Sequence, residues 1–204
     1  MNTPNKLTVA RLVLTLFFVA LMSFAHPIPY FFAYIVFTIA AITDHYDGKI
    51  ARQYGLITNF GKLLDPVADK VLMAAGFLVL MTIRELRVPA WAIILIFARE
   101  YLVTGARSLA AAEGTVIAAN NQGKLKTILQ MVYVFTFLFF ALVFEVFAKY
   151  PAVAALVPGG IDPYKYYIGM ASMISIIAVS LYTVYSGVIF AIENWTVLKL
   201  NQLS

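Results

Sequence analysis

Four aspartates lie close together in one short part of this sequence, and their spacing suits the binding of divalent cations. Asp44 and Asp47 are three residues apart, and Asp65 and Asp69 are four residues apart. On a helix, either spacing puts both carboxylates of a pair on one face. The 204-residue chain has only one other aspartate, Asp162. The two pairs are joined by a short link, so we expect antiparallel helices that bring four carboxylates together.

The cost of burying charge indicates what this cluster holds. An ionised side chain inside a bilayer costs roughly 2.5–3.5 kcal/mol, and two like charges about 4 Å apart repel by about 4 kcal/mol at an effective dielectric constant of about 20. Four carboxylates in apolar surroundings must therefore be protonated or bind cations. Oxygen ligands favour hard ions such as Mg²⁺ or Mn²⁺, and two such ions can clamp a phosphoryl group during transfer. The other interpretation pairs the aspartates, as ordinary helix-end acids, with nearby basic residues: Lys49, Arg52, Lys62 and Lys70.

The composition is that of a membrane protein. The chain is 62% hydrophobic and 12% charged, and its mean hydropathy is +0.86, whereas soluble domains are about a quarter charged. The absence of cysteine excludes disulfides, zinc-thiolate sites and iron–sulfur clusters. Nucleic-acid binding requires a basic face exposed to water, and the sequence shows none. The length suits a single membrane domain, residues 1–204.

The apolar segments predict an all-α protein with six transmembrane helices. A spanning helix needs about 20 mostly apolar residues. Six segments qualify, and their residue ranges are 8–25, 29–51, 60–83, 89–112, 124–148 and 164–192.

The charges of the connecting segments predict an orientation. Segments 84–89 and 149–165 fall on one side, whereas segments 53–59 and 111–124 fall on the other side with both termini. Eleven of the 15 lysines and arginines lie toward this second side. The positive-inside rule then predicts a multi-pass membrane protein with the aspartates facing the cytoplasm.

Small residues at fixed places accompany the aspartates and complete a longer pattern. The full pattern is DxxDGxxAR at residues 44–52, followed by GxxxDxxxD at residues 61–69. Glycine and alanine beside paired carboxylates leave room for a ligand or for another helix. The pattern resembles the complete signature of the CDP-alcohol phosphotransferase family, with every position filled. The predicted six-helix layout is similar to that family's fold.

The resemblance implies both an activity and a set of site residues. Members of the family transfer a phosphatidyl or similar group from a CDP-linked donor to an alcohol and release CMP. The implied ligands of Mg²⁺ (or Mn²⁺), with two ions per site, are Asp44, Asp47, Asp65 and, at the rim, Asp69. Asp69 is also the implied general base, and thus the catalytic residue. The implied pocket for CDP-diacylglycerol consists of Asp44, Gly48, Ala51, Arg52 and Gly61. Members of the family are typically homodimers.

A second group of charged residues suggests what the acceptor is. Arg99 and Arg107 fall on roughly one face of a predicted helix, and Lys124 and Lys126 begin the next helix near the same membrane surface. Basic side chains beside a helix start favour an anion. The other interpretation gives the lysines a snorkelling role at the interface, and pairs Arg99 with Glu100 or with a motif aspartate.

The pattern RE…R…GKxKTxxQ and the N-terminal PNKLTVAR resemble the branch of the family whose acceptor is sn-glycerol 3-phosphate. The resemblance implies that Arg107 and Lys124 bind the acceptor phosphate, that Arg99 and Lys126 support them, and that Thr8 touches substrate. We therefore expect an enzyme that transfers the phosphatidyl group of CDP-diacylglycerol to sn-glycerol 3-phosphate.

Three alternatives remain open from the residues alone. The first keeps the chemistry with another acceptor: inositol phosphate, serine or phosphatidylglycerol. The second is a divalent-cation transporter, although a transporter favours acids near the bilayer midplane and internal repeats. The third is a catalytically inactive scaffold, which would not need all four aspartates.

Overall fold

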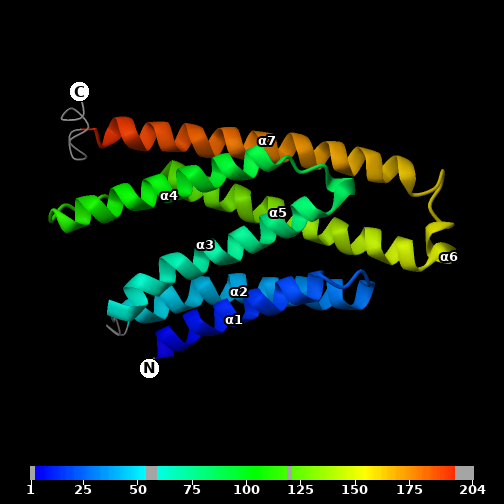
Figure 1. The fold of residues 1–204 in the computed structure, drawn as a ribbon, viewed down its shortest axis with the longest axis horizontal. Coiled ribbons are helices and arrows are strands. Elements are labelled where there is room, and N and C mark those ends of the chain that lie inside the picture. Colours follow the sequence, from blue (N-terminus) through cyan, green and yellow to red (C-terminus); the bar gives the residue numbers. More distant parts are fainter. Residues whose placement is uncertain (1–2, 54–58, 119–120, 196–204) are drawn as a thin grey trace.

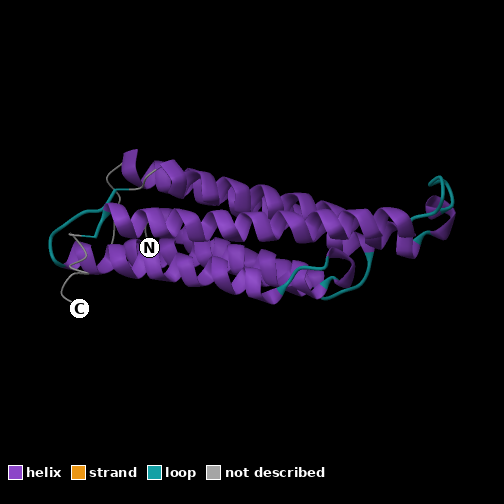
Figure 2. Ribbon diagram, turned by 90° about the horizontal axis from the view of Figure 1, so that it is seen from above, coloured by secondary structure: helices purple, strands orange, loops and turns teal. Residues whose placement is uncertain are grey.

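The computed structural model describes residues 3–53, 59–118 and 121–195. The side chains of residues 3–6, 44–53 and 59–66 lie outside this description. Throughout the described residues the protein is helical and contains no strand, as Figure 2 shows. The prediction of an all-α protein is therefore confirmed.

Within the described residues, six long helices form an elongated bundle, with two short helical turns in the connections (Figure 1). The long helices are α1 (Thr3–Met22), α2 (Pro27–Gln53), α3 (Asn59–Thr82), α4 (Ala90–Ala112), α5 (Asn121–Lys149) and α7 (Asp162–Glu193). The short turns are the 3₁₀ helix η1 (Arg84–Leu86) and α6 (Pro151–Ala154).

All six predicted helices are present, with ends that differ from the prediction by a few residues. Among the described residues, α5 and α7 are long and apolar enough to cross a membrane. Two shorter apolar segments, Leu7–Met22 and Pro27–Thr43, lie within α1 and α2. The number of membrane crossings therefore stays a prediction.

The helices alternate in direction, so the bundle has two ends. At one end, which we call the motif end, α2 and α4 finish and α3 and α5 begin (Figure 1). The opposite end, which we call the distal end, carries η1, α6 and the start of α7. Helix α1 packs on α2 and α3, whereas α4 and α5 pack on α7. Helices α3 and α4 diverge from η1 toward the motif end.

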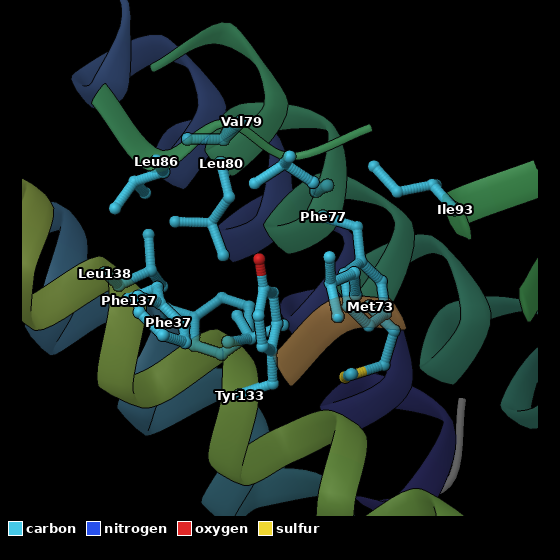
Figure 3. Packing of buried hydrophobic residues seen from close by; sticks show 14 of the residues in the cluster. Phe37, Met73, Phe77, Val79, Leu80, Leu86, Ile93, Tyr133, Phe137 and Leu138 are labelled. Carbon is cyan, nitrogen blue, oxygen red and sulfur yellow. The ribbon is translucent and has the colours of Figure 1, made fainter. Parts of the chain in front are cut away.

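Aromatic rings hold the centre of the bundle together (Figure 3). Phe77 of α3 stacks on Tyr133 of α5 at 6.0 Å between ring centroids, and Phe137 lies 4.7 Å from the same tyrosine. The hydroxyl of Tyr133 forms a 2.9 Å hydrogen bond with Ser172 of α7. Such ring pairs contribute roughly 0.5–1.5 kcal/mol beyond their burial. The core therefore fixes α3, α5 and α7 relative to one another.

The η1 turn is held tightly against α7 at the distal end. Leu86 is fully buried, and Arg87 has a left-handed backbone with φ of 52°. Gly169 of α7 is buried, and a Cβ atom at that position would lie 2.1 Å from the carbonyl oxygen of Glu85. Only a glycine at this position allows the backbone of the turn to approach the helix so closely.

We expect Gly169→Ala to destabilise the protein. The added methyl would meet backbone rather than a flexible side chain, and overpacking of this kind costs about 1–3 kcal/mol. Thermal unfolding in detergent should therefore show a clearly lower Tm. Gly105→Ala is the matched control, because a Cβ atom at Gly105 meets nothing within 4 Å. Equal Tm values for the two variants would contradict the importance of this contact.

Candidate active site

The motif positions lie on two helices that meet at the motif end. Positions 44 and 47 lie in α2, and positions 65 and 69 lie in α3. Helices α2 and α3 contact each other, so both acidic pairs belong to one end of the bundle. The side chains of seven predicted site residues lie outside the described residues: Asp44, Asp47, Gly48, Ala51, Arg52, Gly61 and Asp65.

The described part of the site centres on Asp69. A cavity of about 20 Å³, which we call the motif-end hollow, lies between α3, α4 and α5. Its charged lining residues are Asp69 and Lys70 of α3, Glu100 of α4 and Lys126 of α5. A cavity of this size holds about one water molecule. The hollow therefore joins the proposed base to part of the predicted acceptor site, but it is too small to hold the acceptor itself.

Glu100 connects the two predicted supporting cations. Lys126 Nζ donates a hydrogen bond to Glu100 Oε1, and Arg99 Nη1 lies 3.5 Å from the same oxygen. Lys126 also interacts electrostatically with Asp69. The side chains of Arg99, Glu100 and Lys126 are each at most 15% exposed. Opposite charges in such a poorly solvated place stabilise one another more than at a surface.

Arg99 is fixed from the opposite side by α7. Its Nη2 donates a 2.9 Å hydrogen bond to the hydroxyl of Ser186. A Cβ atom at Gly187 would lie 2.8 Å from Cγ of Arg99, so the glycine leaves room for the arginine stem. Arg99 also lines an apolar groove of about 490 Å³ between α4 and α7. Arg99 thus has protein partners, as the pairing interpretation expected, and it holds Glu100 in place.

Two further polar contacts tie the helices around the hollow. Lys70 Nζ donates a 2.6 Å hydrogen bond to the hydroxyl of Thr104, which links α3 to α4. Gln130 Nε2 donates a 3.2 Å hydrogen bond to the hydroxyl of Thr183, which links α5 to α7. Polar contacts between apolar helices stabilise one register of packing.

The other predicted acceptor residues lie around this centre. The guanidinium carbon of Arg107 lies 5.2 Å from the ring centroid of Phe190, and its buried Nε has no hydrogen-bond partner among the described residues. Lys124 is exposed at the start of α5. Thr8 is fully buried on α1. The structure thus joins Lys126 and Arg99 through Glu100, and Lys126 lines the same hollow as Asp69. No described contact joins Arg107, Lys124 and Thr8 to one another.

The described side chains alone do not form a metal centre. Among them, no group of three or more histidine, cysteine or acidic side chains could hold an ion. Only Asp69 of the four motif aspartates has a described side chain. The donor set is nonetheless suited to a hard cation, because two acidic pairs lie on adjoining helices at one end.

Three residues of this site were not predicted from the sequence. Glu100 appeared there only as a possible partner of Arg99, whereas Thr183 and Ser186 of α7 were not noticed at all. A signal for the latter two exists, because Ser180, Thr183 and Ser186 recur every three residues in an apolar helix and are all fully buried. Polar residues at helical spacing indicate a face that meets other polar groups.

Comparison with known proteins shows a family resemblance across the chain. The family model for CDP-alcohol phosphatidyltransferases matches residues 1–198. A CDP-diacylglycerol–glycerol-3-phosphate 3-phosphatidyltransferase of Bacillus subtilis is 40% identical over 156 residues, covering 71% of this chain and 80% of the relative. A protein of the same name from Rickettsia bellii is 38% identical over 130 residues, covering 64% of this chain and 71% of the relative.

A relative from a third bacterial genus has a similar identity. A probable phosphatidylglycerophosphate synthase of Mycobacterium tuberculosis is 40% identical over 134 residues. The match covers 64% of this chain and 63% of that protein.

Proposed function

The chain belongs to the CDP-alcohol phosphatidyltransferase family, and we propose that it transfers the phosphatidyl group of CDP-diacylglycerol to sn-glycerol 3-phosphate, giving phosphatidylglycerophosphate and CMP. Relatives from three bacterial genera carry names for this reaction. The structural observation that carries the proposal is the placement of Asp69, Glu100 and Lys126 around one hollow at the motif end. The Asp69 carboxylate can accept a proton there, and the neighbouring Lys126 carries a positive charge suited to an anionic acceptor.

The family is generally dependent on divalent cations, and the donor set fits such ions. Asp44, Asp47 and Asp65 would hold Mg²⁺ or Mn²⁺, with Asp69 at the rim. Bound cations would supply neutralisation of the donor diphosphate and of the departing CMP. The residues that would line the donor pocket with Asp44 are Gly48, Ala51, Arg52 and Gly61.

Asp69 would act as the general base. As the acceptor hydroxyl oxygen bonds to the phosphorus that carries diacylglycerol, the bond from that phosphorus to the CMP oxygen breaks. The hydroxyl proton passes to Asp69, since a nearby carboxylate can accept it as the oxygen attacks. Lys126, held by Glu100, would keep the negative charge of Asp69 compensated before the proton arrives.

The acceptor phosphate would bind between the end of α4 and the start of α5. Because the motif-end hollow has a volume of only about 20 Å³, glycerol 3-phosphate must lie at its rim rather than inside it. Arg107 and Lys124 would bind its phosphate there, and Arg99 and Lys126 would support them. Arginine suits this role because its planar fork can donate two hydrogen bonds to one phosphate.

We expect Arg107→Ala to raise the KM for glycerol 3-phosphate by about 10- to 100-fold, because a hydrogen bond to a charged group is worth about 1.5–3 kcal/mol. The KM for CDP-diacylglycerol should change little. Steady-state CMP release with each substrate varied in turn measures both constants, and Arg107→Lys should show a smaller effect. Equal increases in the two KM values would place the acceptor pocket elsewhere.

The protein would be a multi-pass protein of the inner membrane, with the motif end facing the cytoplasm. The excess of lysine and arginine toward that end, 11 of 15, supports this orientation. The family resemblance further suggests a homodimer.

CMP release by the purified protein with different acceptors tests the proposal. The assay contains CDP-diacylglycerol and Mg²⁺ in detergent, with glycerol 3-phosphate, inositol phosphate, serine or phosphatidylglycerol as acceptor and EDTA as a control. We expect release with glycerol 3-phosphate alone, and none after EDTA. Release with another acceptor would refute the roles of Arg107 and Lys124, and no release from folded protein would refute the enzyme assignment.

A further inference from the structure

The distal end carries two hollows that share charged side chains, far from the motif end. The first has a volume of about 320 Å³, and its lining residues are Arg84, Glu85, Arg87, Asp162, Lys165 and Tyr166. The second has a volume of about 290 Å³ and shares Arg84, Glu85 and Lys165 with the first. Tyr30 and Glu145 add polar groups to the second hollow. The shared residues make the two hollows one site, which we call the distal site.

The backbone around the distal site is fixed rather than loose. The close approach of Glu85 to Gly169 holds η1 on α7, and fully buried Leu86 anchors the turn. The guanidinium of Arg87 lies 4.7 Å from the ring centroid of Tyr166, and its Nη1 lies 3.5 Å from Sδ of Met170. A left-handed non-glycine residue such as Arg87 persists only where its surroundings hold it. The backbone that carries these charged side chains is therefore held in one conformation.

The charges of the distal site are mixed and are not paired with each other. Three side chains are basic and three are acidic, and among the described residues no salt bridge joins any of them. Arg84 and Lys165 border both hollows, whereas Glu145 borders only the second. Glu85 and Glu145 both act electrostatically on Tyr30. A ligand with a negative group beside a positive group would complement this arrangement better than a simple anion would.

Exposed aromatic residues indicate that the distal site lies at the level of lipid headgroups. Tyrosine and tryptophan collect at membrane–water interfaces. Exposed aromatic residues of this kind surround the distal end, namely Trp91, Tyr150, Tyr164, Tyr166 and Tyr167. The ligands most available at this level are the phosphate and ammonium groups of the bilayer itself.

We propose that the distal site binds the headgroup of a zwitterionic phospholipid that carries an ammonium group. The phosphate lies between Arg84 and Lys165, and the ammonium faces Glu85 and Glu145 in the second hollow. This lipid is neither donor nor product, because the site is at the opposite end of the bundle from Asp69. The proposal depends on the membrane placement of the distal end and not on the acceptor assignment.

Native mass spectrometry of the full chain in detergent tests the proposal. We expect dioleoyl phosphatidylethanolamine to remain bound in preference to dioleoyl phosphatidylglycerol. Lys165→Ala and Glu145→Gln should each weaken its binding by about tenfold, as loss of one partner of a charge pair does. Lys165→Arg should retain binding. Lys149→Ala is the matched control, because Lys149 lies at the same end and borders neither hollow.

Competition separates a lipid site from a phosphate site. Soluble glycerophosphoethanolamine should displace the lipid, whereas inorganic phosphate should not. Equal displacement by phosphate would overturn the lipid assignment, and tight binding of phosphatidylglycerol unaffected by Glu145→Gln would overturn the zwitterionic assignment. CMP release should stay unchanged in every variant, which shows that each is folded. Unchanged lipid binding in active Lys165→Ala protein would overturn the site itself.

Discussion

Asp69→Asn should lower kcat by about 10²- to 10⁴-fold, which is the contribution expected of a positioned general base. The amide keeps the size of the side chain but cannot accept the hydroxyl proton. Donor affinity should persist, because Asp44, Asp47 and Asp65 remain to hold cations. Steady-state CMP release gives kcat, and calorimetric titration with CDP-diacylglycerol in Mg²⁺ gives donor affinity.

Asp162→Asn is the matched control for this variant. Asp162 is the only aspartate outside the motif, and it lies at the start of α7 at the distal end. Full activity in Asp69→Asn would remove the base assignment. A loss of donor affinity equal to the loss of kcat would make Asp69 chiefly a metal ligand. The relative sizes of the losses in kcat and in donor affinity therefore show whether Asp69 acts as a base or as a metal ligand.

Much of the fold could be predicted from hydropathy because apolar runs of membrane length leave few alternatives. The helix ends were less predictable. Helix α7 begins at Asp162 rather than at residue 164, with a proline in its first turn, where the missing amide hydrogen costs nothing. The short turns η1 and α6 were not predicted, because they depend on contacts with distant helices, such as that between Glu85 and Gly169.

The site could be predicted only where chemistry depends on spacing along one helix. Asp65 and Asp69 are four residues apart, so the sequence alone predicts that they lie on the same face of a helix. Glu100 instead meets Lys126, 26 residues further on, and Arg99 meets Ser186, 87 residues further on. Such pairs depend on how α4, α5 and α7 pack, and periodicity within a single helix does not determine that packing.

Glu100→Gln should be the most destabilising single change at the site. It would leave Arg99 and Lys126, each 8% exposed, without their shared counter-charge, and breaking a buried pair in this way costs about 3–5 kcal/mol. We expect a lower Tm in detergent and a higher KM for glycerol 3-phosphate, because Lys126 loses the group that orients it.

A double variant distinguishes loss of the charge pair from simple disruption of packing. Adding Lys126→Met to Glu100→Gln removes both charges of the hydrogen-bonded pair, so the double variant should be more stable than the sum of the two single losses predicts. Lys149→Gln, an exposed change at the end of α5, should leave Tm unchanged. Strictly additive losses would show that Glu100 and Lys126 are not energetically coupled. Glu100 would then not act through Lys126, and its effect on KM would have to pass through Arg99 or through direct contact with the acceptor.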